Sequence, residues 1–310
     1  MTYMRCMPSH TMDVIVTLPN DLELADELGK KGSIDSMAFY NRKLDNGVIT
    51  VLVPTDIDKR YHALPESITL ADVVVLSSTE MDALFGETLL ACSLLGKEVL
   101  ITDDNDVSGI VAGLQLNHKI VKRGEVLGEL PRYAGHDHES QGDTRIDIDR
   151  AFPVNGVGDV ALGFVTRGSV SKHDKLLHGS GIEVTVRSIQ CQDEDVESAG
   201  VGARVGLALK GISHSDMEKG DVLSKKRIPR SRDFEVKFRL ARVAKAPPPG
   251  DMRCGIASNF TYSEALLSGD GDTRRIRTER AVALDVGDRA LFIRNEKPRI
   301  FAAGEVVKIL

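Results

Sequence analysis

Closely spaced glycines divide the segment 148–211 into short apolar runs. They include Gly156, Gly158, Gly163, Gly168, Gly202, Gly206 and Gly211. Glycine permits tight turns and close approach of neighbouring backbones. From Thr144 onward, short β-type runs recur between Gly and Asp turns, with little helical periodicity. This pattern predicts small β-barrels rather than a helical or mixed fold.

The residues before 130 follow a different pattern, in which strand-like runs alternate with helical stretches. Val73 to Leu76 is fully apolar, as in a buried parallel strand, and Glu80 to Leu95 carries its apolar residues on one helical face. The other predicted elements are strands at Met12–Leu18, Phe39–Arg42, Val48–Val53, Val99–Thr102 and Lys119–Lys122, and helices at Asp21–Gly29 and Val107–Leu114. Such alternation predicts a doubly wound α/β domain.

The change of pattern after Leu130 divides the chain into domains. We predict an α/β domain at 1–131, a linker at 132–143, a β-barrel at 144–226 and a second β-barrel at 227–310. Within the linker, His136 and His138 alternate with acidic residues, which could suggest a metal site. Because no third ligand stands nearby, we interpret this segment as a solvated, flexible connector and expect no bound metal.

Composition narrows the classes of function. The formal net charge of −6 means that any contact with nucleic acid must come from a local basic patch. No apolar run approaches the roughly 20 residues that cross a bilayer, and the start has no secretory pattern. The four cysteines lie far apart, which favours reduced thiols in the cytoplasm. We therefore expect a cytoplasmic protein without a membrane partner.

A family resemblance adds to this reading. The segment Asp149-Arg150-Ala151-Phe152-Pro153-Val154, the glycine run after it, and the later Val186–Gln190 and Gly202–Gly211 segments follow one another as in the second domain of translation elongation factors. The closing residues 303–310 are similar to the last strand of these factors. The chain resembles the elongation factor Tu superfamily, and within it the selenocysteine-specific factor SelB. The resemblance implies a G-domain-like α/β domain followed by two β-barrels.

The motifs by which such factors bind GTP are missing at their expected places. Where GxxxxGK[ST] should follow the first strand, the chain reads Pro19-Asn20-Asp21. The segment Pro54–Asp58 lacks the glycine of DxxGH, and Thr102–Asp106 stands where NKxD is expected. We interpret Gly29–Ser33, the nearest mimic of a phosphate loop, as a helix C-cap and turn. His62 comes too late for the water-orienting role and is expected at the surface.

These absences predict a degenerate first domain that neither binds nor hydrolyses GTP, with no GTP or magnesium as cofactor and no catalytic residue. An anion at the N-terminus of the Asp21 helix is possible in principle. However, Asp21 and Glu23 would repel a phosphate there.

The resemblance also implies a binding pocket in the first barrel. In SelB proteins, selenocysteine lies against an Asp-Arg pair and a later Arg, whose counterparts here are Asp149, Arg150 and Arg204. Two guanidinium groups would favour an anionic aminoacyl side chain. Alternatively, Asp149 and Arg150 form an ordinary surface ion pair and Arg204 lies at a strand end.

Basic residues gather around the boundary between the two predicted barrels and in the middle of the last one. They are Lys225, Lys226, Arg227, Arg230, Arg232, Arg274, Arg275 and Arg277. Such residues can neutralise the phosphates of an RNA backbone. Charged loops on a solvated barrel face explain them equally well, and both interpretations stay open.

The sequence thus predicts a protein related to translation elongation factors, with relatives in archaea, that binds aminoacyl-tRNA or the ribosomal site of such factors without GTP hydrolysis. We expect tRNA or the ribosome as partner, and no DNA. Two alternatives stay open: a GTP-binding factor with atypical motifs, and a protein-interaction scaffold without RNA contact.

Overall fold

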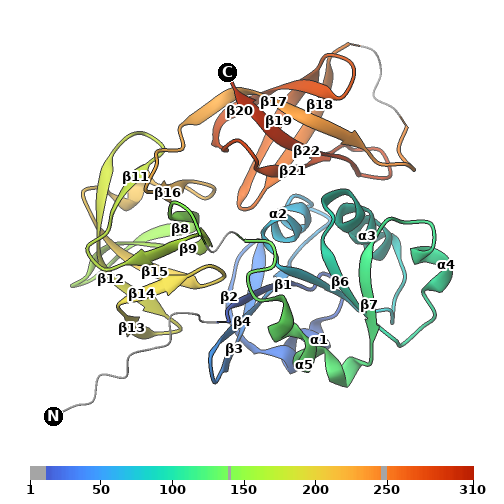
Figure 1. Ribbon diagram of the computed structural model, residues 1–310, viewed down its shortest axis with the longest axis horizontal. Coiled ribbons are helices and arrows are strands. Elements are labelled where there is room, and N and C mark those ends of the chain that lie inside the picture. Colours follow the sequence, from blue (N-terminus) through green and yellow to red (C-terminus); the bar gives the residue numbers. More distant parts are fainter. Residues whose placement is uncertain (1–11, 139–140, 246–249) are drawn as a thin grey trace.

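The computed structural model describes residues 12–138, 141–245 and 250–310. These residues form an α/β domain followed by two β-barrels (Figure 1). The predicted fold class, an α/β domain with two all-β domains, is therefore confirmed.

The first domain is built on a seven-stranded sheet in the order β2-β3-β4-β1-β5-β6-β7. Its strands are β1 (Val14–Thr17), β2 (Lys30–Ile34), β3 (Met37–Leu44), β4 (Gly47–Pro54), β5 (Val73–Leu76), β6 (Glu98–Thr102) and β7 (Asn117–Val121). From β4 to β7 neighbouring strands are parallel, whereas β2, β3 and β4 form an antiparallel edge. Continuous apolar strands such as β1 and β5 are buried on both faces, as parallel strands require.

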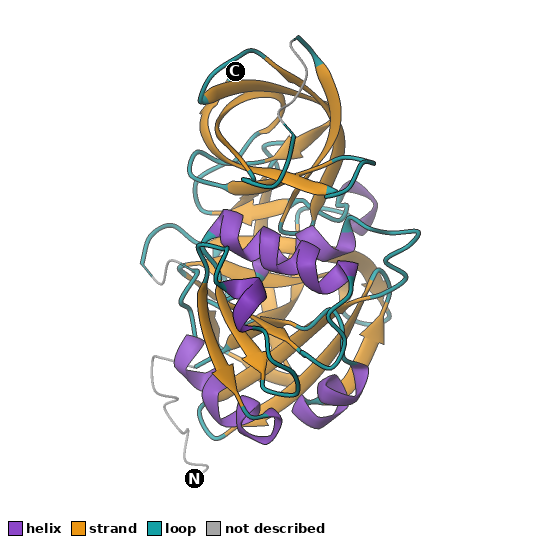
Figure 2. Ribbon diagram, turned by 90° about the vertical axis from the view of Figure 1, so that its right-hand side faces the viewer, coloured by secondary structure: helices purple, strands orange, loops and turns teal. Residues whose placement is uncertain are grey.

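Helices cover both faces of this sheet. They are α1 (Leu22–Leu28), α2 (Ala63–Leu70), α3 (Ala83–Leu95), α4 (Ser108–Val111), α5 (Val126–Glu129) and the short 3₁₀ turns η1 (Arg123–Glu125) and η2 (Leu130–Tyr133). As Figures 1 and 2 show, α2 and α3 lie between the sheet and the last barrel. Helix α3 ends at Gly96, whose φ of 68° is the left-handed conformation that stops a helix.

The second domain wraps seven strands into a barrel with the order β11-β16-β8-β9-β15-β12-β13. Its strands are β8 (Arg145–Val154), β9 (Gly158–Arg167), β10 (Ser169–Ser171), β11 (Lys175–His178), β12 (Glu183–Cys191), β13 (Glu194–Val196), β14 (Ser198–Gly200), β15 (Arg204–Lys210) and β16 (Val222–Ser224); the 3₁₀ turn η3 covers His214–Asp216. An additional pairing of β11 with β12 closes the ring. Strands β10 and β14 form a separate two-stranded ladder.

The third domain is a closed barrel in the order β17-β20-β19-β18-β21-β22. Its strands are β17 (Arg230–Leu240), β18 (Met252–Ser258), β19 (Thr261–Ser268), β20 (Thr273–Ala283), β21 (Arg289–Ile293) and β22 (Ile300–Ile309). Inward-facing side chains alternate with outward-facing ones, as along β19. The aromatic rings of Phe238, Phe292 and Phe301 pack on one another in its core.

Two sequence predictions are wrong in part. Of the segment Gly29–Ser33, interpreted as a helix C-cap and turn, Gly29 is the C-cap of α1 as predicted, but residues 30–33 belong to the edge strand β2 (Lys30–Ile34). The segment 132–143, interpreted as a solvated connector, is exposed at 132, 136 and 141–143. Two of its side chains are packed, however: that of His138 is 6% exposed and that of Asp137 is 20% exposed. Among the described residues, no group of three or more His, Cys, Asp or Glu is placed to hold a metal ion.

Candidate functional site

Polar side chains of the protein itself fill the ligand-binding edge of the first domain. In open α/β sheets, ligands bind outside the carboxyl ends of the strands where strand order reverses, which here is the end of β1. Asn20 lies just beyond β1; its Nδ2 donates to the Ser77 carbonyl at 2.7 Å, and its Oδ1 accepts from the Ser77 amide at 3.1 Å. These two bonds tie the end of β1 to the end of β5.

The N-terminus of α1 is occupied in a similar way. Asp21 accepts the Leu24 amide at 2.8 Å, which caps the helix, and its second oxygen lies 2.6 Å from Nη1 of Arg123. Burial alone would raise the pKa of Asp21, but the hydrogen bonds from Arg123 and Leu24 hold it below its ordinary value. The negative charge that a helix N-terminus favours is thus supplied by the chain itself.

The segment after β6 is also held internally. The Asn105 amide donates to Ser78 Oγ at 2.9 Å, and Asn105 Nδ2 donates to the Ser78 carbonyl at 2.8 Å. Asn105, at the place of NKxD, is therefore hydrogen-bonded to the loop after β5. His62, which we predicted at the surface, is instead half-buried at the start of α2 and stacks on Tyr262 of the third domain at 4.9 Å between ring centroids.

The three residues predicted for the pocket meet in the second domain. Asp149 lies at an irregularity between β8 and β9, where the strand register shifts between Ile148 and Arg150. Such a bulge re-aims a side chain. One carboxylate oxygen of Asp149 lies 3.5 Å from Nε of Arg150 and 3.5 Å from Nη2 of Arg204, which comes from β15. The carboxylate therefore stands between two guanidinium groups.

The first domain covers this group. The Phe39 ring on β3 lies 3.7 Å from Cζ of Arg204, a cation–π contact, and Ser33 Oγ on β2 accepts from Nη2 of Arg204 at 3.3 Å. Burial lowers the pKa of Arg204, while Asp149 opposes this effect. Ring contacts continue from Phe39 to Phe164 and from Phe164 to Phe260, so that all three domains meet beside the site.

Several nitrogens of this group have no hydrogen-bond partner among the described residues. They are Nε and Nη2 of Arg150 and Nε of Arg204, and all three are buried. The 3.5 Å approach of Arg150 to Asp149 is an ion pair without hydrogen-bond geometry. Buried donors are normally satisfied, and an unsatisfied one costs about 1–3 kcal/mol. These nitrogens are hydrogen-bond donors without a described acceptor, and an anionic group is the kind of acceptor that would satisfy them.

Most of the predicted basic residues are exposed, and several of these also form ion pairs. Lys226 and Arg232 are exposed, whereas Arg230 pairs with both Asp221 and Glu218. On β20, Arg275 and Arg277 share Asp233 at 3.0 and 3.3 Å. The remaining contacts are Lys225 with Asp174 at 3.6 Å, Arg227 with the Gly179 carbonyl at 3.1 Å, and Arg274 with Asp270 at 3.6 Å. Because most of these charges are partly neutralised, the basic patch is weaker than the sequence suggests.

A cavity of about 670 Å³ opens where the three domains meet. His62 and Glu66 line it from the first domain, Lys219 from the second, and Tyr262 and Arg280 from the third. Lys219 lies 2.6 Å from the buried carboxylate of Glu66. A ligand bound in this cavity would therefore touch all three domains.

Sequence reasoning missed the residues that the first domain adds to the site. Ser33 and Phe39 lie more than 160 positions before Arg204, and nothing in their local pattern marks them. Asp137, which forms ion pairs with Lys97 and Arg289, was also missed. Its position beside two histidines was only a weak sequence signal, and the local sequence around its two partners is ordinary.

The chain is similar in sequence to known proteins. The family model described as elongation factor Tu domain 2 matches residues 158–224. An uncharacterized protein of Methanocaldococcus jannaschii is 28% identical over 298 residues, covering 90% of this chain and 94% of the relative. The selenocysteine-specific elongation factor of the same organism is 29% identical over 230 residues, or 62% of this chain and 49% of that factor.

Solved structures show the same fold. The elongation factor SelB from Methanococcus maripaludis, in complex with the GTP analogue GPPNHP, superimposes with a TM-score of 0.78 at 18% identity, covering 96% of this chain and 79% of that one. In sequence, by contrast, the match to the selenocysteine-specific factor of Methanocaldococcus jannaschii spans about half of that factor's length. Among its described helices, none is long and apolar enough to pass through a bilayer.

Proposed function

We propose that this chain binds the aminoacyl end of a tRNA, or the ribosomal site that elongation factors visit, without hydrolysing GTP. Its match to elongation factor Tu domain 2 at residues 158–224 and its similarity to a selenocysteine-specific elongation factor support this proposal. The observation that supports this most directly is the group of Asp149, Arg150 and Arg204. Its buried, unpartnered guanidinium nitrogens are suited to an anionic or strongly polar aminoacyl group. The arrangement does not select selenocysteine over other anions.

The proposal that GTP is not used rests on the first domain. The three GTP-binding motifs are missing from the sequence. Asn20 and Asp21, which stand in place of a phosphate loop, are bonded to Ser77, Leu24 and Arg123. A nucleotide phosphate would have to break these bonds and would meet the Asp21 carboxylate.

A working GTPase with unusual motifs is the alternative, because a related fold has been solved with a GTP analogue bound. Isothermal titration with GTP and with GDP in the presence of magnesium separates the two functions. We expect no binding at micromolar concentrations. A dissociation constant in the micromolar range would contradict the nucleotide-free proposal.

Filter binding with charged and uncharged tRNA tests the pocket. We expect Arg150→Ala combined with Arg204→Ala to weaken binding of charged tRNA by about tenfold or more, since two charge-assisted contacts are lost. Arg187→Ala is the matched control, because Arg187 is an exposed arginine on the same barrel. It donates to the Val157 carbonyl and forms no ion pair with the residues that the structure describes. Equal affinities of the double variant and the control for charged tRNA would contradict the proposed pocket.

A further inference from the structure

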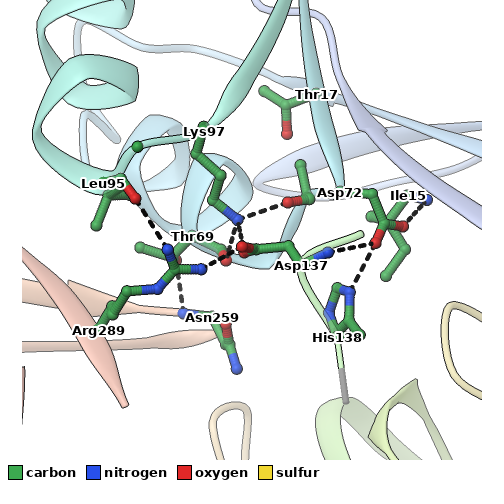
Figure 3. Close-up of polar contacts among 12 residues, drawn as sticks. Ile15, Thr17, Thr69, Asp72, Leu95, Lys97, Asp137, His138, Asn259 and Arg289 are labelled. Carbon is green, nitrogen blue, oxygen red and sulfur yellow. Dashed lines mark hydrogen bonds and ion pairs between the residues drawn. The ribbon is translucent and has the colours of Figure 1, made fainter. Parts of the chain in front are cut away.

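A buried lysine stands at the junction of the first and third domains. Lys97 follows Gly96 at the end of α3, and its side chain is 1% exposed. Its Nζ donates to the carbonyls of Thr69 at 2.9 Å and Ala71 at 2.5 Å, both at the C-terminal end of α2, and to the Asp137 carboxylate (Figure 3). A cation is favoured at a helix C-terminus, but a fully buried one also needs a counter-charge.

The same carboxylate binds a second cation from another domain. Arg289, the first residue of β21, donates to Asp137 from Nη2 and to the Leu95 carbonyl at 2.9 Å from Nη1. Asp137 therefore stands between Lys97 of the first domain and Arg289 of the third. Without the carboxylate, these two positive charges would face each other and repel.

Asp137 is held in place by its own chain. The Asp137 amide donates to Asp72 Oδ1 at 3.4 Å, and His138 Nδ1 lies 2.9 Å from the same oxygen. The other oxygen of Asp72 accepts the Ile15 amide of β1 at 2.8 Å, so that this carboxylate joins the segment to the central strand. The chain then reaches the second domain at β8, only a few residues further on.

Other contacts along this junction make the two domains one packed unit. Glu87 on α3 accepts the backbone amides of Arg299 at 2.6 Å and Ile300 at 3.0 Å. Side chains of α2 and α3 share a hydrophobic cluster with Leu291 and Ile300. Burial alone would raise the pKa of Asp137, but the charges of Lys97 and Arg289 hold it below its ordinary value.

We propose that Asp137 is a latch that keeps the first domain docked on the third barrel in the absence of any nucleotide. In a nucleotide-switched GTPase, contacts to the γ-phosphate and Mg²⁺ order the switch segments, which are released on hydrolysis. Here, an internal carboxylate from the segment leading to the second domain supplies the charge that holds the two domains together. A displacement of the second barrel that pulled on this segment would therefore loosen the other two domains as well.

Hydrogen–deuterium exchange of the full chain, followed by mass spectrometry, tests this latch. In Asp137→Asn, we expect exchange to rise by about tenfold or more in α3 and in β21–β22, since Lys97 loses its counter-charge. The matched control is Asp35→Asn, which removes the same charge from an exposed pair with Arg60 and is expected to leave both regions unchanged. Unchanged exchange in Asp137→Asn would overturn the proposal.

Two further variants distinguish a latch from general damage to the fold. Arg289→Met removes only the cation of the third domain and leaves the pair of Lys97 and Asp137 intact, so exchange should rise at the junction but not at the centre of the sheet. Lys97→Met with Asp137→Asn removes both buried charges and should restore part of the protection lost in Asp137→Asn. Wild-type protection that changes on addition of GTP or GDP, or a double variant no better protected than Asp137→Asn, would contradict the latch.

Discussion

At the scale of single residues, Asp21 shows how one side chain changes what a site can bind. It caps α1 through the Leu24 amide and pairs with Arg123, and the side chain of Asp21 is only 9% exposed. The sequence indicated a helix beginning here, with Asn20 or Asp21 as its cap, because both are preferred N-cap residues. Arg123 as the partner of Asp21 could not be predicted, since it lies about 100 positions further along the chain.

Asp21→Ala should lower the free energy of unfolding by about 1–2 kcal/mol, because the cap is lost and Arg123 loses its main partner. Urea denaturation followed by circular dichroism measures this change. Glu27→Ala is the control: Glu27 also contacts Arg123 at 3.2 Å but is largely exposed, so we expect less than about 0.5 kcal/mol. An equal loss in the two variants would show that Asp21 has no special role.

Asp21→Asn tests the charge separately, since Asn can keep the cap. The pKa of Asp21 is lower in the folded state than in the unfolded chain. Its carboxylate therefore stabilises the fold above the ordinary pKa of an aspartate, and this contribution is lost as the pH falls through the folded value. We expect a stability difference between wild type and variant of about 1 kcal/mol at pH 7 that disappears in acid. A difference that is constant with pH would contradict the assignment.

At the scale of elements, helices and strands were predicted correctly where the local hydrophobic pattern of the sequence agrees with the burial of the element. Apolar strands such as β5 and the helix α3 were predicted because their local pattern matches their environment. Helix α2 was missed: all eight of its residues, polar ones included, are buried, so its sequence has no pattern of one exposed and one buried face, and it contains Pro65. Strand β2 was missed for the opposite reason, since none of its residues is buried and its pairing to β3 sets its structure.

Gly163 in β9 gives an element-scale prediction. A Cβ at this position would lie 2.3 Å from the Asp147 carbonyl oxygen on β8. Relieving this clash would require the backbone of β8 to shift, which is energetically costly. Gly163→Ala should therefore destabilise the second domain by about 2 kcal/mol, measured by thermal unfolding. Gly86→Ala in α3 is the comparison, because nothing lies within 4 Å of its added methyl; it should be neutral or stabilise by up to about 1 kcal/mol. The reverse order would contradict the packing described for β8 and β9.

At the scale of the whole molecule, the three domains are packed into one closed arrangement. Phe39, Phe164 and Phe260 join all three, and Asp137 links the first domain to the third. The sequence predicted the succession of the domains and the grouping of Asp149 with its two arginines. It did not predict how the domains pack, because contacts between residues so far apart leave no local periodicity.

The most direct test of this account is the affinity for charged tRNA, measured in parallel without nucleotide, with GDP and with GTP, each with magnesium. We predict one dissociation constant under all three conditions, weakened in the Arg150→Ala, Arg204→Ala variant. Binding that appears only with GTP would contradict the account, as would equal affinity of the wild type and this variant.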